Sequence, residues 1–243
     1  MRILVLGTGQ GGTCPLLEVV RGLGIASFTN AVEDRRFFNH KTLPQGYGTK
    51  LTTDSVEKIK AKNFSSFLEK LKVYMKKYAD LYIVFSLRHP VDVFMANLVR
   101  GQRPSDGGDG EMRKNRVSGT GTINGSLFAI SHTHNVYKNI VSLFPERIIT
   151  VKLEDLILTP ETEVRRIAKF FRVEPTQQAY EFYKHNRNEY QRRRYGDNLD
   201  KSVVALYKKW DTWHDGFFRE RRSDIDFAIG RLIDVIQDWG YEF

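Results

Sequence analysis

The chain opens on a strand-like segment that runs directly into a glycine-rich loop and then into a helix-like segment. Residues 1–13 read MRILVLGTGQGGT. Glycines at positions 7, 9, 11 and 12 allow the backbone to turn tightly and to bring its N–H groups close to an anion. The helix that we expect over residues 14–23 points the positive end of its dipole at the same place. The sequence therefore predicts a phosphate-binding cradle for a nucleotide or nucleotide-like ligand.

The loop by itself fits two nucleotide-binding motifs. Gly7, Gly9 and Gly12 have the G-x-G-x-x-G spacing of dinucleotide-binding folds, and Gly7 to Thr13 fits a Walker A loop that lacks its lysine. A plain tight turn is the structural alternative. The position between a strand and a helix favours a ligand loop, and both nucleotide motifs stay open at this point.

Composition sets the size and charge of the protein. The 243 residues, 41% hydrophobic and 12% aromatic, fit one large domain over residues 1–243, with an α/β core over 1–175 and a helical region over 176–243. The 38 Lys and Arg residues outnumber the 29 Asp and Glu residues, and the net charge of +9 favours phosphorylated ligands. The basic residues are dispersed and form no nucleic-acid-binding motif, so we expect no nucleic acid partner.

Several features indicate a cytoplasmic protein without membrane insertion. Cys14 is the only cysteine, which excludes an internal disulfide and suits a reducing compartment. Met1 leads directly into the first strand, and no apolar run approaches about 20 residues. His132 and His134 have no supporting acidic or cysteine ligands, so we expect them at a helix surface or edge and predict no metal site.

Strands alternate with helices along the first 175 residues, which predicts a three-layer α/β fold around a mainly parallel sheet. Four strands are identifiable and the pattern leaves room for a fifth, while Asn30 to Lys50 is expected to be mostly loop. The expected strands are the short apolar segment that runs into the glycines after Met1, and residues 25–28, 81–87 and 147–152. The expected helices cover residues 14–23, 65–79, 91–100, 127–144, 160–171, 177–185, 201–213 and 223–239.

Three anchors in this order resemble the sulfotransferase superfamily. They are the glycine loop, the strand end Arg88-His89-Pro90, and the segment Lys152 to Leu156 followed by Thr159-Pro160-Glu161. The glycine loop, which continues into Leu16-Leu17-Glu18, is most similar to that of glycosaminoglycan-type sulfotransferases. The resemblance covers roughly residues 1 to 175 and implies a P-loop-NTPase-like fold with a helical C-terminal part.

This resemblance implies a function and a binding site. Such enzymes bind 3′-phosphoadenosine 5′-phosphosulfate (PAPS), move its sulfuryl group to an acceptor hydroxyl or amine, and release 3′-phosphoadenosine 5′-phosphate (PAP). A loop of backbone amides and a guanidinium at the end of a strand both suit phosphate groups. The residues implied for the nucleotide are Gly9, Gln10, Gly11, Gly12, Thr13 and Cys14 around the 5′-phosphosulfate, Arg88 and Asn97 at the 3′-phosphate, and Arg193, Arg194 and Gly196 in a C-terminal basic loop.

The loop departs from the family pattern at the position that carries charge. Gln10 stands where the family has lysine or arginine, which neutralises charge at the transferring group. A basic residue elsewhere would have to supply that charge, and the candidates are Arg35, Arg36 and Lys41. There are two other departures. Ala96 stands where the family has the serine that binds the 3′-phosphate, and its neighbour Asn97 is the candidate substitute. Cys14 replaces a hydroxyl residue of the loop.

The acceptor must lose a proton, so the site needs a general base. Glu33 is the first candidate, His40 the second because imidazoles exchange protons near neutral pH, and Asp34 is less favoured. Carbohydrate is the preferred acceptor class because the loop resembles the glycosaminoglycan type and because aromatic side chains suit sugar stacking, while a lipid or a small metabolite stays open as the acceptor. The aromatic candidates are Phe37, Phe38 and Tyr47. The glycine-rich segment from Gly101 to Gly125 is expected to be mobile, either as a lid or as a surface insertion.

Three other functions compete with this one. A non-catalytic module that binds the nucleotide or the acceptor is suggested by Gln10 together with Ala96. An NAD(P)-dependent oxidoreductase would use the same glycines, but Glu33 is misplaced for the ribose and the Arg-His-Pro strand end has no counterpart there. A kinase or NTPase is disfavoured because the loop lacks lysine and Asp80 precedes its strand.

Overall fold

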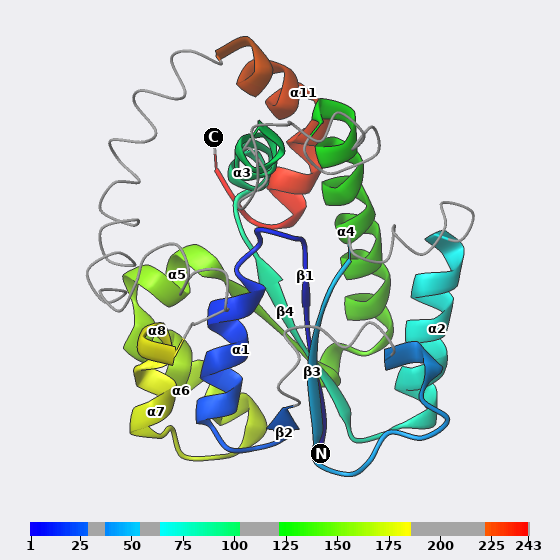
Figure 1. The fold of residues 1–243 in the computed structure, drawn as a ribbon, viewed down its shortest axis with the longest axis vertical. Coiled ribbons are helices and arrows are strands. Elements are labelled where there is room, and N and C mark those ends of the chain that lie inside the picture. Colours follow the sequence, from blue (N-terminus) through cyan, green and yellow to red (C-terminus); the bar gives the residue numbers. More distant parts are fainter. Residues whose placement is uncertain (29–36, 54–63, 103–121, 186–221, 243) are drawn as a thin grey trace, which may run out of the picture.

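All strand pairings are parallel in the computed structural model, which describes residues 1–28, 37–53, 64–102, 122–185 and 222–242. The five strands lie in the order β2-β3-β1-β4-β5 (Figure 1). This arrangement confirms the predicted α/β fold with a parallel central sheet. The strands are β1 (Arg2–Gly7), β2 (Ser27–Phe28), β3 (Tyr47–Thr52), β4 (Leu81–Leu87) and β5 (Ile148–Lys152).

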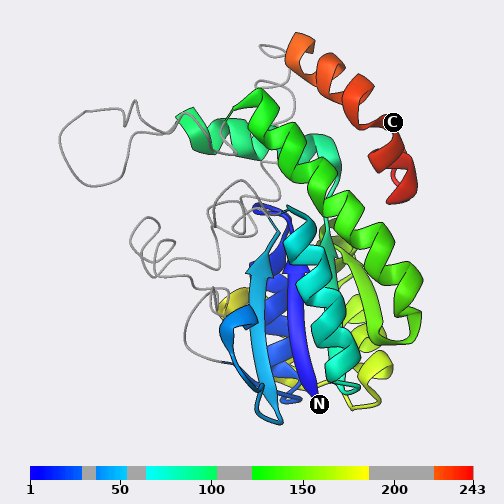
Figure 2. The ribbon, with the colours of Figure 1, turned by 90° about the vertical axis from the view of Figure 1, so that its right-hand side faces the viewer.

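Helices cover both faces of the sheet, as Figures 1 and 2 show. On β1, Leu4 and Leu6 join one core cluster and Ile3 and Val5 join the other, because successive strand residues point to opposite faces. The first cluster includes residues of α2 (Phe64–Lys77), α3 (Pro90–Gln102), α4 (Ile123–Leu143) and α11 (Arg222–Asp238). The second includes residues of α1 (Thr13–Gly22), α5 (Leu153–Leu158), α6 (Pro160–Phe171), α7 (Gln177–Tyr180) and α8 (Phe182–His185).

The strand β3 corrects the expectation that Asn30 to Lys50 is mostly loop. Tyr47–Thr52 lies between β2 and β1 and pairs in register from Ile3↔Gly48 to Gly7↔Thr52. Its sequence, YGTKLT, mixes glycine and lysine with apolar residues, so it lacks the signature of a buried strand. The glycine is needed because a Cβ on Gly48 would lie only 2.7 Å from the Phe28 ring. The lysine side chain is buried in spite of its charge.

Helix positions follow the predicted order, with small shifts at the ends. The helix expected over 177–185 is divided into α7 and α8, and the helix expected over 201–213 lies outside the described residues. His132 of α4, expected at a surface or edge, is buried and packs against the Phe67 ring of α2. No helix in the described ranges combines the length and the apolar character that a membrane crossing requires.

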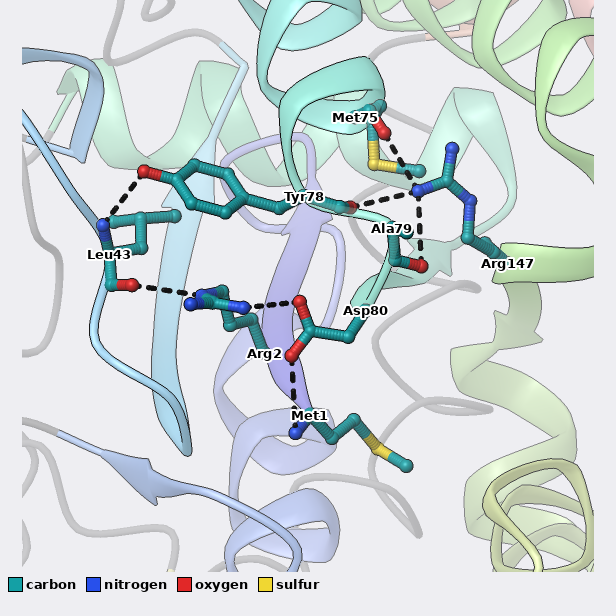
Figure 3. A network of polar contacts seen from close by, with 8 residues as sticks. All are labelled: Met1, Arg2, Leu43, Met75, Tyr78, Ala79, Asp80 and Arg147. Atoms are coloured by element: carbon teal, nitrogen blue, oxygen red, sulfur yellow. Dashed lines mark hydrogen bonds and ion pairs between the residues drawn. The ribbon is translucent and has the colours of Figure 1, made fainter.

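A polar network closes the amino end of the sheet (Figure 3). Asp80 accepts from Arg2 and pairs with the Met1 ammonium group at 3.4 Å. The Arg2 Nε donates to the Leu43 carbonyl at 2.9 Å, and the Leu43 N–H donates to the Tyr78 hydroxyl at 2.9 Å. These contacts tie the beginnings of β1 and β4 to the segment that precedes β3.

Arg147 adds a second set of contacts at the same end (Figure 3). One of its guanidinium nitrogens lies 2.7 Å from the Met75 carbonyl and 2.9 Å from the Tyr78 carbonyl. These carbonyls belong to the last turn of α2 and the residue that follows it, where backbone acceptors have no partner within the helix. The contacts at the amino end of the sheet therefore have a structural role, because they hold α2 and the beginnings of the strands together.

Candidate functional site

The glycine loop lies at the opposite, carboxyl end of the sheet, between β1 and α1 (Figure 1). Gln10 and Gly12 both have left-handed backbone conformations, with φ of 65° and 87°. A Cβ on Gly11 would lie 2.4 Å from the Thr8 hydroxyl, and one on Gly12 would lie 2.8 Å from Leu153. Glycine is therefore needed at both positions for the loop to close.

The first turn of α1 presents backbone donors without a capping side chain. Its cap residue is Gly12, and its first turn contains no acidic residue. The first N–H groups of a helix have no acceptor within the helix, and they carry the positive end of the dipole. The loop and the helix together make a cradle suited to a phosphate-like anion.

The end of β4 holds the loop in place. The Ser86 hydroxyl donates to the Gly11 carbonyl at 2.6 Å, and the Arg88 guanidinium donates to the Gln10 carbonyl at 3.0 Å. The structure thus brings Arg88 to the glycine loop, in the crevice where open parallel sheets bind ligands.

The third anchor reaches the same place. Leu153 packs over Gly12, and the Glu154 carboxylate accepts from the His89 backbone N–H at 2.9 Å. The three sequence anchors, which are far apart in the chain, therefore meet around one loop.

Lys50 is a candidate site residue that the sequence analysis missed. It lies on β3, is only 5% exposed, and its ammonium group is 3.3 Å from the Cys14 sulfur. The register of β3 on β1, with Lys50 opposite Val5, carries its side chain toward α1. Recognition of residues 47–52 as a strand parallel to β1 would have revealed Lys50. A lysine two residues before the carboxyl end of such a strand lies close to the loop that follows β1.

Asp92 is a buried carboxyl group in the first turn of α3, one helical turn after Arg88. Burial raises the pKa of Asp92 to about 6, although the charges of Arg88 and His89 act in the opposite direction. The site therefore contains an acid that titrates close to neutrality.

Asn97 lies farther along α3 and faces the protein interior. Its side chain is 1% exposed, and its amide nitrogen donates to the Ser126 hydroxyl of α4 at 3.2 Å. This contact joins the two helices and does not reach the glycine loop.

The structure does not bring His40 to the loop. Its ring packs 5.9 Å from the ring of Tyr47, the first residue of β3, and its carbonyl accepts from Tyr74 at the end of α2. A strand rises about 3.3 Å per residue, so the amino end of β3 is on the order of 20 Å from the glycine loop. Lys41 is exposed beside His40, at that same end.

The aromatic residues expected to stack on a sugar are mostly part of the core. Phe37 is 1% exposed and Tyr47 is 8% exposed, and both belong to the core cluster beside α2. Phe38 is partly buried and packs edge-on against Phe37 and Phe67. The expectation that Phe37 and Tyr47 offer a sugar platform was wrong, because a buried ring has no face left for a ligand.

Several predicted site residues lie outside the described residues. They are Glu33, Asp34, Arg35, Arg36, Arg193, Arg194 and Gly196. Most of the segment from Gly101 to Gly125 is also outside, while its two ends belong to α3 and α4. In the part of the chain that the structure describes, no three His, Cys, Asp or Glu side chains gather as metal ligands.

Comparisons with solved structures reveal the same fold in sulfotransferases. The sulfotransferase domain from the curacin biosynthetic pathway aligns with a TM-score of 0.53 at 13% identity, over 75% of this chain and 77% of that one. Sulfotransferase STF1 from Mycobacterium tuberculosis aligns with a TM-score of 0.51 at 11% identity, over 74% and 70%. Mouse sulfotransferase SULT7A1, solved with PAP, aligns with a TM-score of 0.49 at 13% identity, over 76% and 64%.

Sequence comparison gives a family but no individual relative. No curated protein matches the chain significantly. The model of the sulfotransferase family matches residues 27–178, a range that begins after the glycine loop and includes Lys50, Arg88 and Glu154. Because this match spans more than half of the 243 residues, the chain belongs to the sulfotransferase family.

Proposed function

We propose that this protein transfers a sulfuryl group from PAPS to an acceptor hydroxyl or amine. Carbohydrate is the preferred acceptor class because the glycine loop resembles that of glycosaminoglycan-type sulfotransferases. The observation that carries the proposal is that two cationic side chains flank the glycine loop. Arg88 contacts the Gln10 carbonyl, and Lys50 contacts Cys14 in the first turn of α1. Donor and product of this reaction are polyanionic nucleotides, so their binding requires such charges.

The loop fits the 5′-phosphosulfate end of the nucleotide. Glycine is required at positions 11 and 12 by close contacts, and Gly12 leaves the first turn of α1 uncapped. In the proposed complex the backbone of Gly9 to Cys14 surrounds the anion, and the Thr13 hydroxyl adds a donor. PAPS supplies an activated sulfuryl group whose S–O bond to the phosphate breaks as the bond to the acceptor forms.

Arg88 is the proposed ligand of the 3′-phosphate. A planar guanidinium binds phosphate with paired hydrogen bonds, and Arg88 is already placed beside the loop by its contact with Gln10. Asn97 is left out of this set because its amide is engaged with Ser126 inside the protein. Arg193, Arg194 and Gly196 stay predictions from the family resemblance.

Lys50 is the proposed replacement for the cation that Gln10 lacks. Negative charge builds on the leaving phosphate oxygen during transfer, and a nearby ammonium group in a buried setting stabilises it strongly. Lys50 is buried beside Cys14 in the first turn of α1, whereas Lys41 lies at the far end of the sheet. Glu33 stays the first candidate for the base that takes the acceptor proton, because His40 packs away from the loop.

A non-catalytic nucleotide-binding module is the alternative function. The exposed Gln10 and the remote position of His40 favour it. Binding and transfer must therefore be tested separately.

The first test is calorimetric binding of PAP to the unchanged protein and to Arg88→Ala, with NADP as the comparison ligand. We expect micromolar binding of PAP, weaker binding of NADP, and a loss of roughly 10- to 100-fold in the variant, as for a charged hydrogen bond. Arg165→Ala is the matched control, since this exposed arginine contacts Tyr180 of α7 and not the loop. Absence of PAP binding, or a preference for NADP, would contradict the proposal.

The second test separates the enzyme from the binding module. Transfer of labelled sulfate from PAPS is measured over a panel of carbohydrate, lipid and small-molecule acceptors. Product formation that depends on Lys50 supports the transferase. Tight PAP binding with no transfer to any acceptor supports the module.

A further inference from the structure

The Glu154 carboxylate joins the end of the chain to the strand end that carries Arg88. One of its oxygens accepts from the His89 backbone N–H at 2.9 Å, and the other accepts from the Tyr241 hydroxyl at 2.7 Å. Glu154 is in the first turn of α5, while Tyr241 follows the last turn of α11. Three segments that are distant in sequence therefore share one carboxylate.

Tyr241 is held in place by further contacts. Its ring lies edge-on to the His89 ring with centroids 5.1 Å apart, and the Lys152 ammonium group is 4.5 Å from its ring centroid. Lys152 also donates to the Gly240 carbonyl at 2.6 Å, and the Tyr241 N–H donates to the Ile236 carbonyl at 2.9 Å. The left-handed Gly240, with φ of 68°, turns the chain back after α11 for these contacts.

The hydroxyl of Tyr241 acts as a permanent donor in this arrangement. Burial and the neighbouring Glu154 charge both raise the pKa of Tyr241, so the phenol keeps its proton. The Glu154 carboxylate is consequently fixed from both sides, which leaves the His89 backbone little freedom.

His89 directly follows Arg88, whose guanidinium reaches the Gln10 carbonyl of the glycine loop. A shift of the His89 backbone would therefore move Arg88 relative to the loop. We propose that Tyr241 is a positioning residue that, through Glu154 and His89, sets the guanidinium of Arg88 for the phosphate of the nucleotide. The ligand part of this inference rests on the proposed function, whereas the effect on His89 does not.

The test compares Tyr241→Phe with Tyr78→Phe. Both changes remove one phenol hydroxyl that makes a hydrogen bond, and Tyr78 belongs to the network at the amino end of the sheet (Figure 3). Three quantities are measured for each protein: the melting temperature, amide hydrogen exchange in residues 86–92, and PAP binding by calorimetry. Tyr78→Phe controls for a general loss of stability.

We expect Tyr241→Phe to speed exchange at His89 and to weaken PAP binding about five- to tenfold, part of the value of a hydrogen bond to a charged group. In turnover, KM for PAPS should rise with kcat nearly unchanged. Tyr78→Phe should lower the melting temperature and leave exchange in 86–92 and PAP binding at the level of the unchanged protein.

Two outcomes would overturn the inference. One is a Tyr241→Phe protein with His89 exchange and PAP affinity unchanged, and the other is equal changes in both variants. If the unchanged protein does not bind PAP, the proposed function fails, and amide exchange at His89 alone tests the positioning role of Tyr241. Faster exchange in Tyr241→Phe but not in Tyr78→Phe supports that role, and unchanged exchange in Tyr241→Phe refutes it.

Discussion

The Lys50 ammonium group lies 3.3 Å from the Cys14 sulfur, which places a buried cation of β3 beside the glycine loop of β1 and α1. The loop residue Gln10 has no charge of its own, and in the proposed function Lys50 of the neighbouring strand supplies the cation that this position lacks. Its effect on transfer is directly testable.

Lys50→Met should reduce sulfuryl transfer far more than it reduces nucleotide binding. Loss of a group that stabilises developing charge costs on the order of 10²–10³ in kcat, while the ground-state anion keeps the loop amides and Arg88. The measurement is kcat and PAP affinity for both proteins. Gln10→Lys in the Lys50→Met background should restore part of the activity. If Lys50→Met keeps the kcat of the unchanged protein and the added Gln10→Lys has no effect, Lys50 has no part in the mechanism.

Gly11→Ala should abolish PAP binding and lower stability. The added Cβ would lie 2.4 Å from the Thr8 hydroxyl, so the loop must open to accommodate it. We expect a cost of about 1–3 kcal/mol, as for other overpacked sites. Gly230→Ala is the matched control, because its Cβ meets nothing within 4 Å on α11, and alanine there should stabilise the helix by up to about 1 kcal/mol. Equal PAP affinity in the two variants would show that the loop is not the binding site.

The sequence predicted those parts of the fold that have a local signature. Leu81–Leu87 was expected as a strand with the same bounds, because its apolar run suits burial on both faces. Pro160 was expected at the start of a helix, and α6 begins there. The Thr159 side chain makes no cap on this helix, because its hydroxyl donates back to the Asp155 carbonyl.

The parts that sequence reasoning missed depend on tertiary contacts. β3 is a strand because it fills the space between β1 and β2, where Phe28 packs on Gly48 and Lys50 meets Cys14. His40 stands near Glu33 in sequence, but contacts with Tyr47 and Tyr74 hold it at the amino end of the sheet. The role of Glu154 was hidden for the same reason, since its partners His89 and Tyr241 are far away in the chain.

Asp92→Asn should make the protein more stable at neutral pH. The pKa of Asp92 is raised from 3.8 to about 6, so the folded state holds the proton more tightly than the unfolded state does. Its favourable contribution is complete below about pH 4 and is lost as the pH rises through about 6, a change on the order of 3 kcal/mol. Urea unfolding between pH 4 and pH 7 should show a smaller decline for Asp92→Asn.

Asp226→Asn on the exposed side of α11 is the control for Asp92→Asn. It should follow the pH profile of the unchanged protein, because surface ion pairs contribute little. Identical slopes for Asp92→Asn and the unchanged protein would mean that Asp92 does not titrate in this range.

Asp80→Asn should weaken the amino end of the sheet and leave the proposed nucleotide site intact. Burial opposes ionisation of Asp80, but hydrogen bonds and charges from Arg2 and the Met1 ammonium group outweigh it and lower the pKa of Asp80 below 3.8. The contribution to stability is therefore present at neutral pH and is lost as the pH falls below about 4. Because Asp80 is 39% exposed, we expect a loss of about 1 kcal/mol or less at pH 7, reduced further by salt.

The check on Asp80→Asn combines unfolding with binding. Urea unfolding at pH 7 should show the loss in low salt and a smaller one in high salt, and the difference from the unchanged protein should shrink as the pH falls below about 4. PAP affinity should be unaltered, because Asp80 precedes β4 whereas Arg88 follows it, and these two ends of the strand have separate contacts. A change in PAP affinity as large as that of Arg88→Ala would contradict this separation of the structural end of the sheet from its binding end.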